Sequence, residues 1–145
     1  MAMLLGEYNH QLDAKNRFRI PARLRKELGE EYYFAKGANH CVHIFSKAGL
    51  EELFSKAGEI KFSDLEGQKN LEAFAMSIVP ATEDAQGRIV LPPELREHAM
   101  LGKDDKDLVI CGAITRINIW STKGFEERYG NQSKDFNSVI KGLGF

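Results

Sequence analysis

The sequence has little of what marks secreted, membrane-spanning or nucleic-acid-coating proteins. Two cysteines, Cys41 and Cys111, are too few among 145 residues for a disulfide framework. No apolar run approaches the length that crosses a bilayer, and the first residues lack the basic segment of a signal peptide. The net charge is only −1, so any attraction to nucleic acid must come from a local basic patch, or from several patches combined in an oligomer. These absences predict a cytoplasmic protein with no membrane partner.

Signatures of catalysis are also absent from the sequence. It has no glycine-rich phosphate loop, no nucleophile elbow and no Ser-His-Asp arrangement. The run from His40 to His43 resembles a metal cluster, but on a strand only Cys41 and His43 share a face, and two ligands do not make a zinc site. The helix dipole and solvation explain the paired glutamates near two helix starts, which are Glu51, Glu52, Glu126 and Glu127. We therefore expect no enzyme, no cofactor and no metal.

What the sequence does contain is a duplication. Residues 13–25 and 84–96 align at an offset of 71 with six identities in thirteen positions, including the pairs Asp13/Asp84 and Arg17/Arg88. A second match, at an offset of 75, relates residues 45–54 to 120–129. The change of offset implies four extra residues in the second copy, most naturally in the polar stretch 102–106.

Each copy predicts the same succession of elements. Asn16 or Gly87 closes a turn, because both residue types tolerate positive φ. Pro21 or Pro92 stands where a helix begins, and Ser46 or Ser121 is placed to cap a closing helix. The predicted ranges are strands 7–12, 18–20, 32–35 and 42–45 with helix 22–28 in the first copy, and strands 89–91, 108–111 and 117–120 with helix 93–99 in the second.

The segment between the copies predicts one longer amphipathic helix. Residues 63–66 match a capping box with Ser63 as the cap, and apolar residues follow at helical spacing, at Leu71, Phe74, Ala75 and Ile78. A copy of about 45 residues has too little core to be stable alone, so the copies must bury their apolar faces against each other or against other subunits. The expected divisions are a first repeat at 6–50, a helical connector at 51–80, a second repeat at 81–124, and a C-terminal helix and tail at 125–145. The tail from residue 131 has few helix signals and no assigned function.

The repeated Asp-x-x-x-Arg motif has two interpretations. In the structural one, the carboxylate caps the turn and the arginine pairs with it. In the functional one, the arginines bind phosphates or guanine edges, for which their rigid fork of donors is suited. Residues 13–26 carry a local charge of +5, and alternation along a strand places Arg17 and Arg19 on one face. Residues 83–97 carry −2, so the first copy should make most of the phosphate contact.

The doubled motif, together with residues 6–17, Ile20 to Arg23, Leu91-Pro92 and Ile119 to Ser121, resembles the MraZ family over nearly the whole chain. Asn16 stands where the first motif of the family commonly has glycine. The resemblance implies an α+β fold of two tandem AbrB-like swapped-hairpin half-domains, mostly antiparallel β with short helices, related by a pseudo-twofold axis. It also implies ring-shaped homo-oligomers, association with the nucleoid, and binding of double-stranded DNA at repeated promoter boxes of the division and cell-wall gene cluster.

Residues from both lines of reasoning form the predicted DNA-binding set. The resemblance implies Asp13, Arg17, Asp84 and Arg88, and the basic patch adds Lys15, Arg19, Arg23 and Arg25. Three alternatives to a sequence-specific transcriptional regulator stay open. They are a structural or partner-binding ring without DNA affinity, an antitoxin-like module that shares the fold, and a small enzyme such as a methyltransferase.

Overall fold

The computed structural model describes residues 3–130 and 135–145. Two antiparallel sheets organise it. The larger has the strand order β1-β7-β8-β4-β3-β5, with β1 Glu7–Gln11, β3 Tyr32–Lys36, β4 Val42–Ser46, β5 Val79–Pro80, β7 Asp107–Gly112 and β8 Ile117–Ser121. The smaller is the pair β2 Arg17–Phe18 and β6 Ile89–Val90. The helices are α1 Ala22–Arg25, α2 Lys47–Ala57, α3 Leu65–Met76, α4 Pro93–His98, α5 Thr122–Tyr129 and α6 Phe136–Gly142, with a 3-10 turn η1 at Ala38–His40.

The two halves exchange their first strands. In the large sheet β1 of the first repeat pairs with β7 of the second, with Tyr8 opposite Ile110. Correspondingly, β5, which ends the predicted connector and is equivalent to part of β1 at the offset of 71, pairs with β3 of the first repeat. Phe18 lies opposite Ile89 in the small sheet, and His43 lies opposite Asn118 where β4 meets β8. Because each of these two pairs joins equivalent positions of the duplication, the pseudo-twofold axis passes through both. The predicted α+β fold of tandem swapped-hairpin halves is confirmed.

A single core joins the repeats. It lies between the large sheet and a layer formed by β2, β6, α1 and α4, and its buried residues come in equivalent pairs such as Phe18 with Ile89 and Leu24 with Leu95. Ile44 and Ile119 of the central strands are fully buried in the same cluster. Burial of each such side chain stabilises the fold by roughly 1.5–3 kcal/mol. Neither half could bury these residues without the other, as the sequence predicts.

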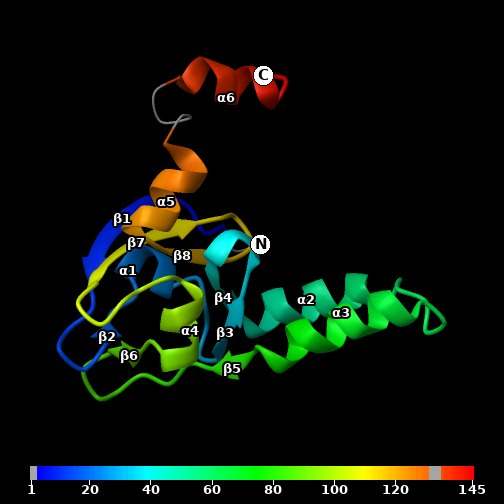
Figure 1. The fold of residues 1–145 in the computed structure, drawn as a ribbon, viewed down its shortest axis with the longest axis horizontal. Helices are drawn as coiled ribbons and strands as arrows, with labels where there is room; N and C mark the ends of the chain where they lie inside the picture. Colours follow the sequence, from blue (N-terminus) through cyan, green and yellow to red (C-terminus); the bar gives the residue numbers. More distant parts are fainter. Residues whose placement is uncertain (1–2, 131–134) are drawn as a thin grey trace.

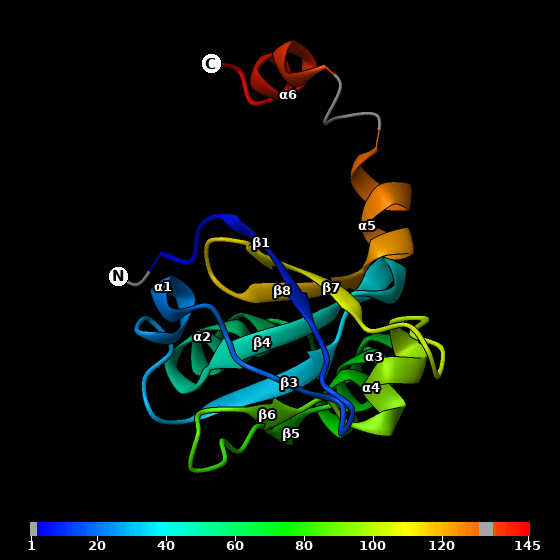
Figure 2. The same cartoon turned by 90° about the vertical axis from the view of Figure 1, so that its left-hand side faces the viewer.

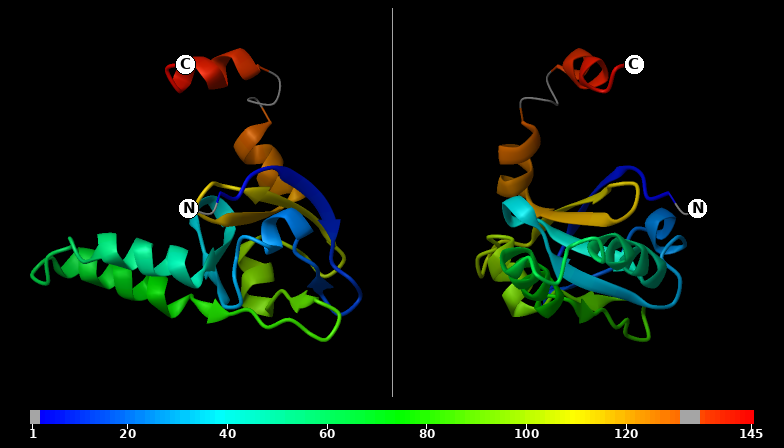
Figure 3. Two further views of the ribbon diagram at one scale, coloured as in Figure 1. Left: turned by 180° about the vertical axis from the view of Figure 1, so that it is seen from behind. Right: turned by 90° about the vertical axis from the view of Figure 1, so that its right-hand side faces the viewer.

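The connector differs from the single joining helix that the sequence predicts. α2 and α3 run side by side and project from the sheets as an arm (Figures 1 and 3), and Phe54 of α2 contacts Phe74 of α3 with ring centroids 6.3 Å apart. The cap of α3 is Asp64 rather than Ser63, because the Asp64 carboxylate accepts a hydrogen bond of 2.9 Å from the Gly67 amide. α3 ends at Met76, so Ile78 lies beyond the helix.

Other boundaries also shift. α1 ends at Arg25 instead of Leu28, because the amides of Glu27 and Leu28 bond to carbonyls only three residues back and tighten the last turn. The predicted caps are confirmed, since Ser46 and Ser121 accept hydrogen bonds from the amides of Gly49 and Gly124 at 2.9 and 3.0 Å. The four-residue insertion lies in the loop between α4 and β7, where the sequence predicts it.

The C-terminal segment contains more helix than the sequence predicts. α5 packs on the outer face of the large sheet, where Tyr129 meets Trp120 edge-on with ring centroids 5.8 Å apart. α6 lies away from the sheets (Figure 1), and Asp135 caps it by accepting a hydrogen bond from the backbone amide of Ser138. Residues 131–134 of the predicted tail lie outside the described residues. Within the described part of the chain, no helix is long and apolar enough to cross a membrane.

Candidate nucleic-acid interface

Each Asp-x-x-x-Arg motif folds into the same turn. In the first, Oδ1 of Asp13 accepts hydrogen bonds from the amides of Lys15 and Arg17 at 2.8 and 2.9 Å. Oδ2 accepts a third bond from Nε of Arg17 at 2.8 Å. Asn16 takes a φ of 60°, the left-handed conformation that asparagine tolerates. The amide of Arg17 lowers the pKa of Asp13 most and the amide of Lys15 adds to this, so the carboxylate stays ionised.

The second turn repeats these contacts. Asp84 accepts from the amides of Gln86 and Arg88 at 2.8 and 2.9 Å and from Nε of Arg88 at 2.9 Å, and Gly87 has a φ of 77°. The hydrogen bond from the Arg88 amide is the largest effect on the pKa of Asp84, and it lowers this pKa. Burial acts in the opposite direction but does not cancel the lowering. The structural interpretation of the motif is therefore correct for both copies. It does not exclude the functional one, because it leaves donors of the arginines free.

The pseudo-twofold axis brings the two turns together into one charged group. Nη1 of Arg17 lies 3.8 Å from Oδ2 of Asp84, and Nη1 of Arg88 lies 3.9 Å from Oδ2 of Asp13. We call these four residues the Asp–Arg quartet. The arginine side chains keep 24% and 28% of their surface exposed, and no hydrogen bond or ion pair with another described residue engages Nη2 of either one. The quartet thus holds two guanidinium groups in fixed orientations, each with donors available to a ligand.

The quartet lies on an exposed face. Phe18, Ile20 and Ile89 point into the core, so the residues that alternate with them, including Arg17 and Arg19, point outward as the sequence predicts. Both turns lie at the end of the molecule that is opposite the arm (Figures 1 and 2). Lys15 and Arg19 are exposed beside the quartet. Because the quartet itself carries no net charge, Lys15 and Arg19 add positive charge at this face.

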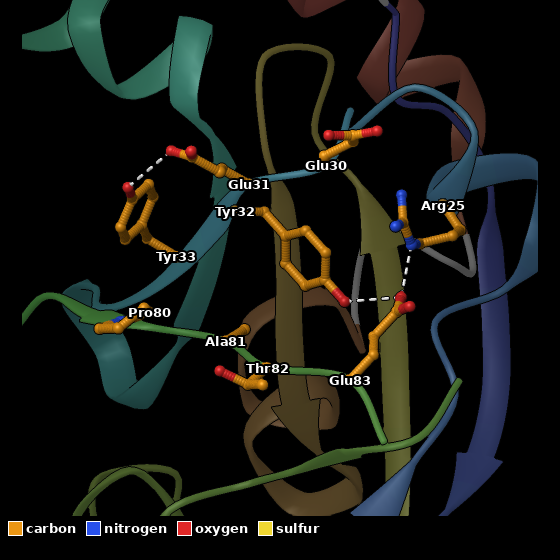
Figure 4. A pocket seen from close by; sticks show the side chains of 9 residues that line it. All are labelled: Arg25, Glu30, Glu31, Tyr32, Tyr33, Pro80, Ala81, Thr82 and Glu83. Carbon is orange, nitrogen blue, oxygen red and sulfur yellow. Dashed lines mark hydrogen bonds and ion pairs between the residues drawn. The ribbon is translucent and has the colours of Figure 1, made fainter. Parts of the chain in front are cut away.

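Arg25 lies apart from the quartet, in contacts that hold the repeats together. Its Nε lies 2.5 Å from Oε1 of Glu83, which also accepts a bond of 2.7 Å from the Tyr32 hydroxyl (Figure 4). Its guanidinium also lies 5.0 Å from the centre of the Tyr32 ring, and Nη1 donates to the Gly29 carbonyl. The Arg25 and Tyr32 bonds lower the pKa of Glu83, while burial raises the pKa of Tyr32. These groups line an open pocket of about 480 Å³ at the sheet edge.

Because the repeats exchange strands, each turn lies next to charged residues of the other copy. The first turn lies beside α4, because Ala14, Asn16 and Glu97 line one pocket. The second turn follows Glu83, which pairs with Arg25 of α1. Each turn is therefore flanked by the helix of the other repeat, so adding charges along either copy does not give the charge around its turn.

One contact at the first turn could not be predicted from the Asp-x-x-x-Arg motif. Lys106, from the four-residue insertion, donates from Nζ to Oδ1 of Asn16 at 2.8 Å. It adds a cation next to Lys15 that comes from the second repeat. Sequence reasoning missed it because the two residues are 90 positions apart.

His43, Cys41 and Cys111 lie on the other face of the large sheet. Nδ1 of His43 donates to Oδ1 of Asn118 over 2.7 Å, and burial lowers the pKa of His43. Burial raises the pKa of the Cys41 thiol to about 12 and that of the Cys111 thiol to about 11. Both are free thiols, as the sequence predicts. Among the described residues, no group of three or more potential ligands is placed to hold a metal ion.

Comparison with known proteins identifies the family. The chain matches the MraZ protein family over residues 3–71 and 79–140. A curated relative from Carboxydothermus hydrogenoformans is 40% identical over 119 residues, which is 82% of this chain and 81% of the relative. Relatives from Moorella thermoacetica and Thermoanaerobacter pseudethanolicus are 37% and 34% identical, over 96% and 97% of this chain and 95% and 96% of their own. All three are named transcriptional regulator MraZ. The doubled turn, the exchanged hairpins and these matches agree, and the chain belongs to the MraZ family.

Proposed function

We propose that this protein is a transcriptional regulator that binds double-stranded DNA through the Asp–Arg quartet and carries out no catalysis. The observation that carries the proposal is the pair of arginines held side by side on one exposed face, each fixed by the aspartate of its own turn and lying near that of the other. Preoriented guanidinium groups bind guanine edges or phosphates at a lower cost in side-chain entropy than mobile ones.

The shape of this face is suited to the major groove. That groove admits a two-stranded β-ribbon, and the antiparallel pair β2–β6 presents the quartet from such a ribbon. In this proposal Arg17 and Arg88 contact base edges, while Lys15 and Arg19 contact phosphates and set the register. Arg25 is left out, because its Nε and Nη1 are engaged by Glu83 and Gly29.

Affinity is proposed to come from several subunits acting together. A face with few free cations gives weak, salt-sensitive attraction to phosphates. A homo-oligomer, in the ring form that the family resemblance implies, presents many such faces, and repeated promoter boxes spaced to match them add the weak contacts into strong binding. The proposed boxes lie upstream of the division and cell-wall gene cluster, so the protein would act in the cytoplasm, on the nucleoid. The names of the curated relatives support a role in transcription.

The substitution Arg17→Ala tests this proposal. We expect about 5- to 150-fold weaker binding to the upstream promoter DNA in a mobility-shift titration, since a good arginine–base contact contributes about 1–3 kcal/mol. The fold should persist, because the Asp13 carboxylate keeps its bonds to the two backbone amides of the turn. The matched control is Arg128→Ala, an exposed arginine on α5, and it should bind as the wild type does.

An unchanged affinity of a folded Arg17→Ala variant would contradict the assignment. The same titration tests a second candidate, a structural ring without DNA affinity, which the net charge of −1 and the neutral quartet favour. Failure of the wild-type protein to shift promoter DNA at low salt would support that second candidate.

A further inference from the structure

The two repeats differ in how they fill the space between the large sheet and the helices on its outer face. α5 of the second repeat and α2 of the first are equivalent helices at the offset of 75. Under α5, Tyr129 packs edge-on against Trp120, and the ring of Phe125 has its centroid 5.0 Å from that of Tyr129. Cys41 belongs to the same cluster and is only 2% exposed. The second repeat therefore fills this space with side chains of the protein itself.

The equivalent space in the first repeat is open. The residues that correspond at the same offset to Trp120, Tyr129 and Cys41 are, in that order, Phe45, Phe54 and Arg116. Phe54 lies against Phe74 of α3, and among the described residues no ring contact joins it to Phe45. An open pocket of about 240 Å³ remains between α2, α3 and the hairpin that joins β7 to β8. The pocket is thus specific to the first repeat and is not required by the duplicated fold.

Three side chains give the pocket an apolar lining. Phe45 comes from the sheet, Leu53 from α2 and Phe74 from α3. Aromatic side chains favour offset or edge-on contact with another ring, and Tyr129 makes such a contact with Trp120 in the second repeat. The volume is below the roughly 300–1,000 Å³ of pockets that hold drug-sized ligands. The pocket is therefore suited to a small ligand built on a single ring.

Arg116 brings an available positive charge to this lining. It is partly exposed, and its guanidinium donates one long hydrogen bond of 3.4 Å to the Thr115 hydroxyl. No carboxylate of the described residues forms an ion pair with it. Lys56 adds a second cation and Glu52 one anion, so the lining carries a net charge of +1. Burial lowers the pKa of His43, and the Arg116 charge lowers it further, so this imidazole adds no charge at neutral pH.

We infer that the pocket binds a small aromatic carboxylate, with its ring against Phe45 and Phe74 and its carboxylate on Arg116. The ligand has in the first repeat the role that the Tyr129 ring has in the second. A neutral aromatic molecule would leave the guanidinium without an acceptor, and a carboxylate without a ring would leave the apolar lining uncovered. The pocket lies where the arm joins the large sheet, away from the quartet at the opposite end (Figure 1). The inference goes beyond DNA binding, and its test contains no DNA.

Fluorine NMR of para-fluorophenylacetate tests the site, because the signal of this probe broadens when it binds a large molecule. We expect saturable broadening with the wild type and about 10- to 150-fold weaker binding with Arg116→Gln, which removes the charged donors of the carboxylate. The matched control Arg128→Gln removes an exposed arginine of α5 and should bind the probe as the wild type does. Para-fluorobenzyl alcohol has the ring without the carboxylate, and trifluoroacetate has the carboxylate without the ring. Each should bind at least about tenfold more weakly than para-fluorophenylacetate.

A second variant gives the first repeat the side chains of the second. In Phe45→Trp/Arg116→Cys the indole should fill the pocket and remove probe binding, and the fold should persist because the same pair packs in the second repeat. Thermal unfolding without the probe checks that this variant and Arg116→Gln are folded. No saturable binding to the wild type, wild-type affinity in either folded variant, or equal binding of the alcohol would overturn the inference. Arg17→Ala should bind the probe normally, so a failure of the DNA proposal is seen separately.

Discussion

At the scale of single residues, the aspartates of the two turns act on the fold and on the site at once. Asp13 and Asp84 each accept three hydrogen bonds, two from backbone amides and one from an arginine. Such bonds favour the charged form of the carboxyl group. The same oxygen atoms that close the turns therefore orient the guanidinium groups proposed to contact DNA.

The acid stability of the protein should depend on this pair. A carboxyl group whose pKa is lowered by folding stabilises the native state above its unfolded value, near 3.8 for aspartate, and loses that contribution as the pH falls through the lowered pKa. We expect the double variant Asp13→Asn/Asp84→Asn to be less stable at neutral pH and to lose less stability on acidification. Urea unfolding between about pH 5 and pH 2 measures this. Equal slopes for the variant and the wild type would show that the carboxylates do not contribute.

The turns were predictable at this scale because their chemistry is local. Asp-x-x-x-Arg places the acceptor, the amides and the guanidinium within five residues, and Asn16 and Gly87 meet the one demanding backbone conformation. The contacts between repeats were not predictable. Arg25 and Glu83 are 58 positions apart, and neither residue type determines which distant partner it meets.

At the scale of elements, alternating apolar residues located most strands correctly, and the ends of elements were the weaker part. Helix ends depend on small differences between competing hydrogen bonds, as in the tightened last turn of α1. α6 was missed because a seven-residue helix has few periodic positions, although Asp135 followed by Ser138 was a usable capping signal. The arm was predicted only in part. The helical spacing of apolar residues predicted α3, but it could not show that α3 folds back on α2.

The edge of the large sheet depends on Gly112, the last residue of β7. A Cβ atom there would lie 2.3 Å from the amide nitrogen of Leu5 and 2.5 Å from the carbonyl oxygen of Leu4. Gly112→Ala should therefore push the N-terminal segment off the sheet and lower the free energy of unfolding by about 1–3 kcal/mol. Thermal unfolding measures the loss of stability. The amide of Leu4 donates to the carbonyl of Ile114 and the amide of Ile114 donates to the carbonyl of Leu4, so faster hydrogen exchange at these two amides would locate the loss.

Gly142→Ala is the matched control for this change. Nothing lies within 4 Å of a Cβ atom at Gly142, so stability should stay close to that of the wild type. A Gly112→Ala variant as stable as this control would show that the segment adjusts without cost.

At the scale of the whole molecule, the exchange of strands makes each repeat depend on the other. β1 has its partner in the second repeat and β5 has its partner in the first, and the core contains equivalent residues from both. The duplication predicts that the halves meet, but which strand pairs with which follows only from the three-dimensional arrangement. The family resemblance implied swapped-hairpin halves, but it did not name the strand partners.

Separated halves should therefore fold only together. We expect fragments 1–62 and 63–145, cut in the loop between α2 and α3, to be unfolded as monomers and to form one cooperative species when mixed. Circular dichroism and light scattering of each fragment and of the mixture measure this. A cooperatively folded monomer of fragment 1–62 would show that the first repeat is self-sufficient.

The pair at the centre of the large sheet shows what it means to carry both halves on one polypeptide. In a homodimer of identical halves, the residue on the symmetry axis must face its own copy, so histidine would meet histidine. Here Nδ1 of His43 instead donates to Oδ1 of Asn118, a different side chain that accepts what the first one offers. Because both halves are on one chain, this central pair is free of self-complementarity, and its two positions carry different side chains.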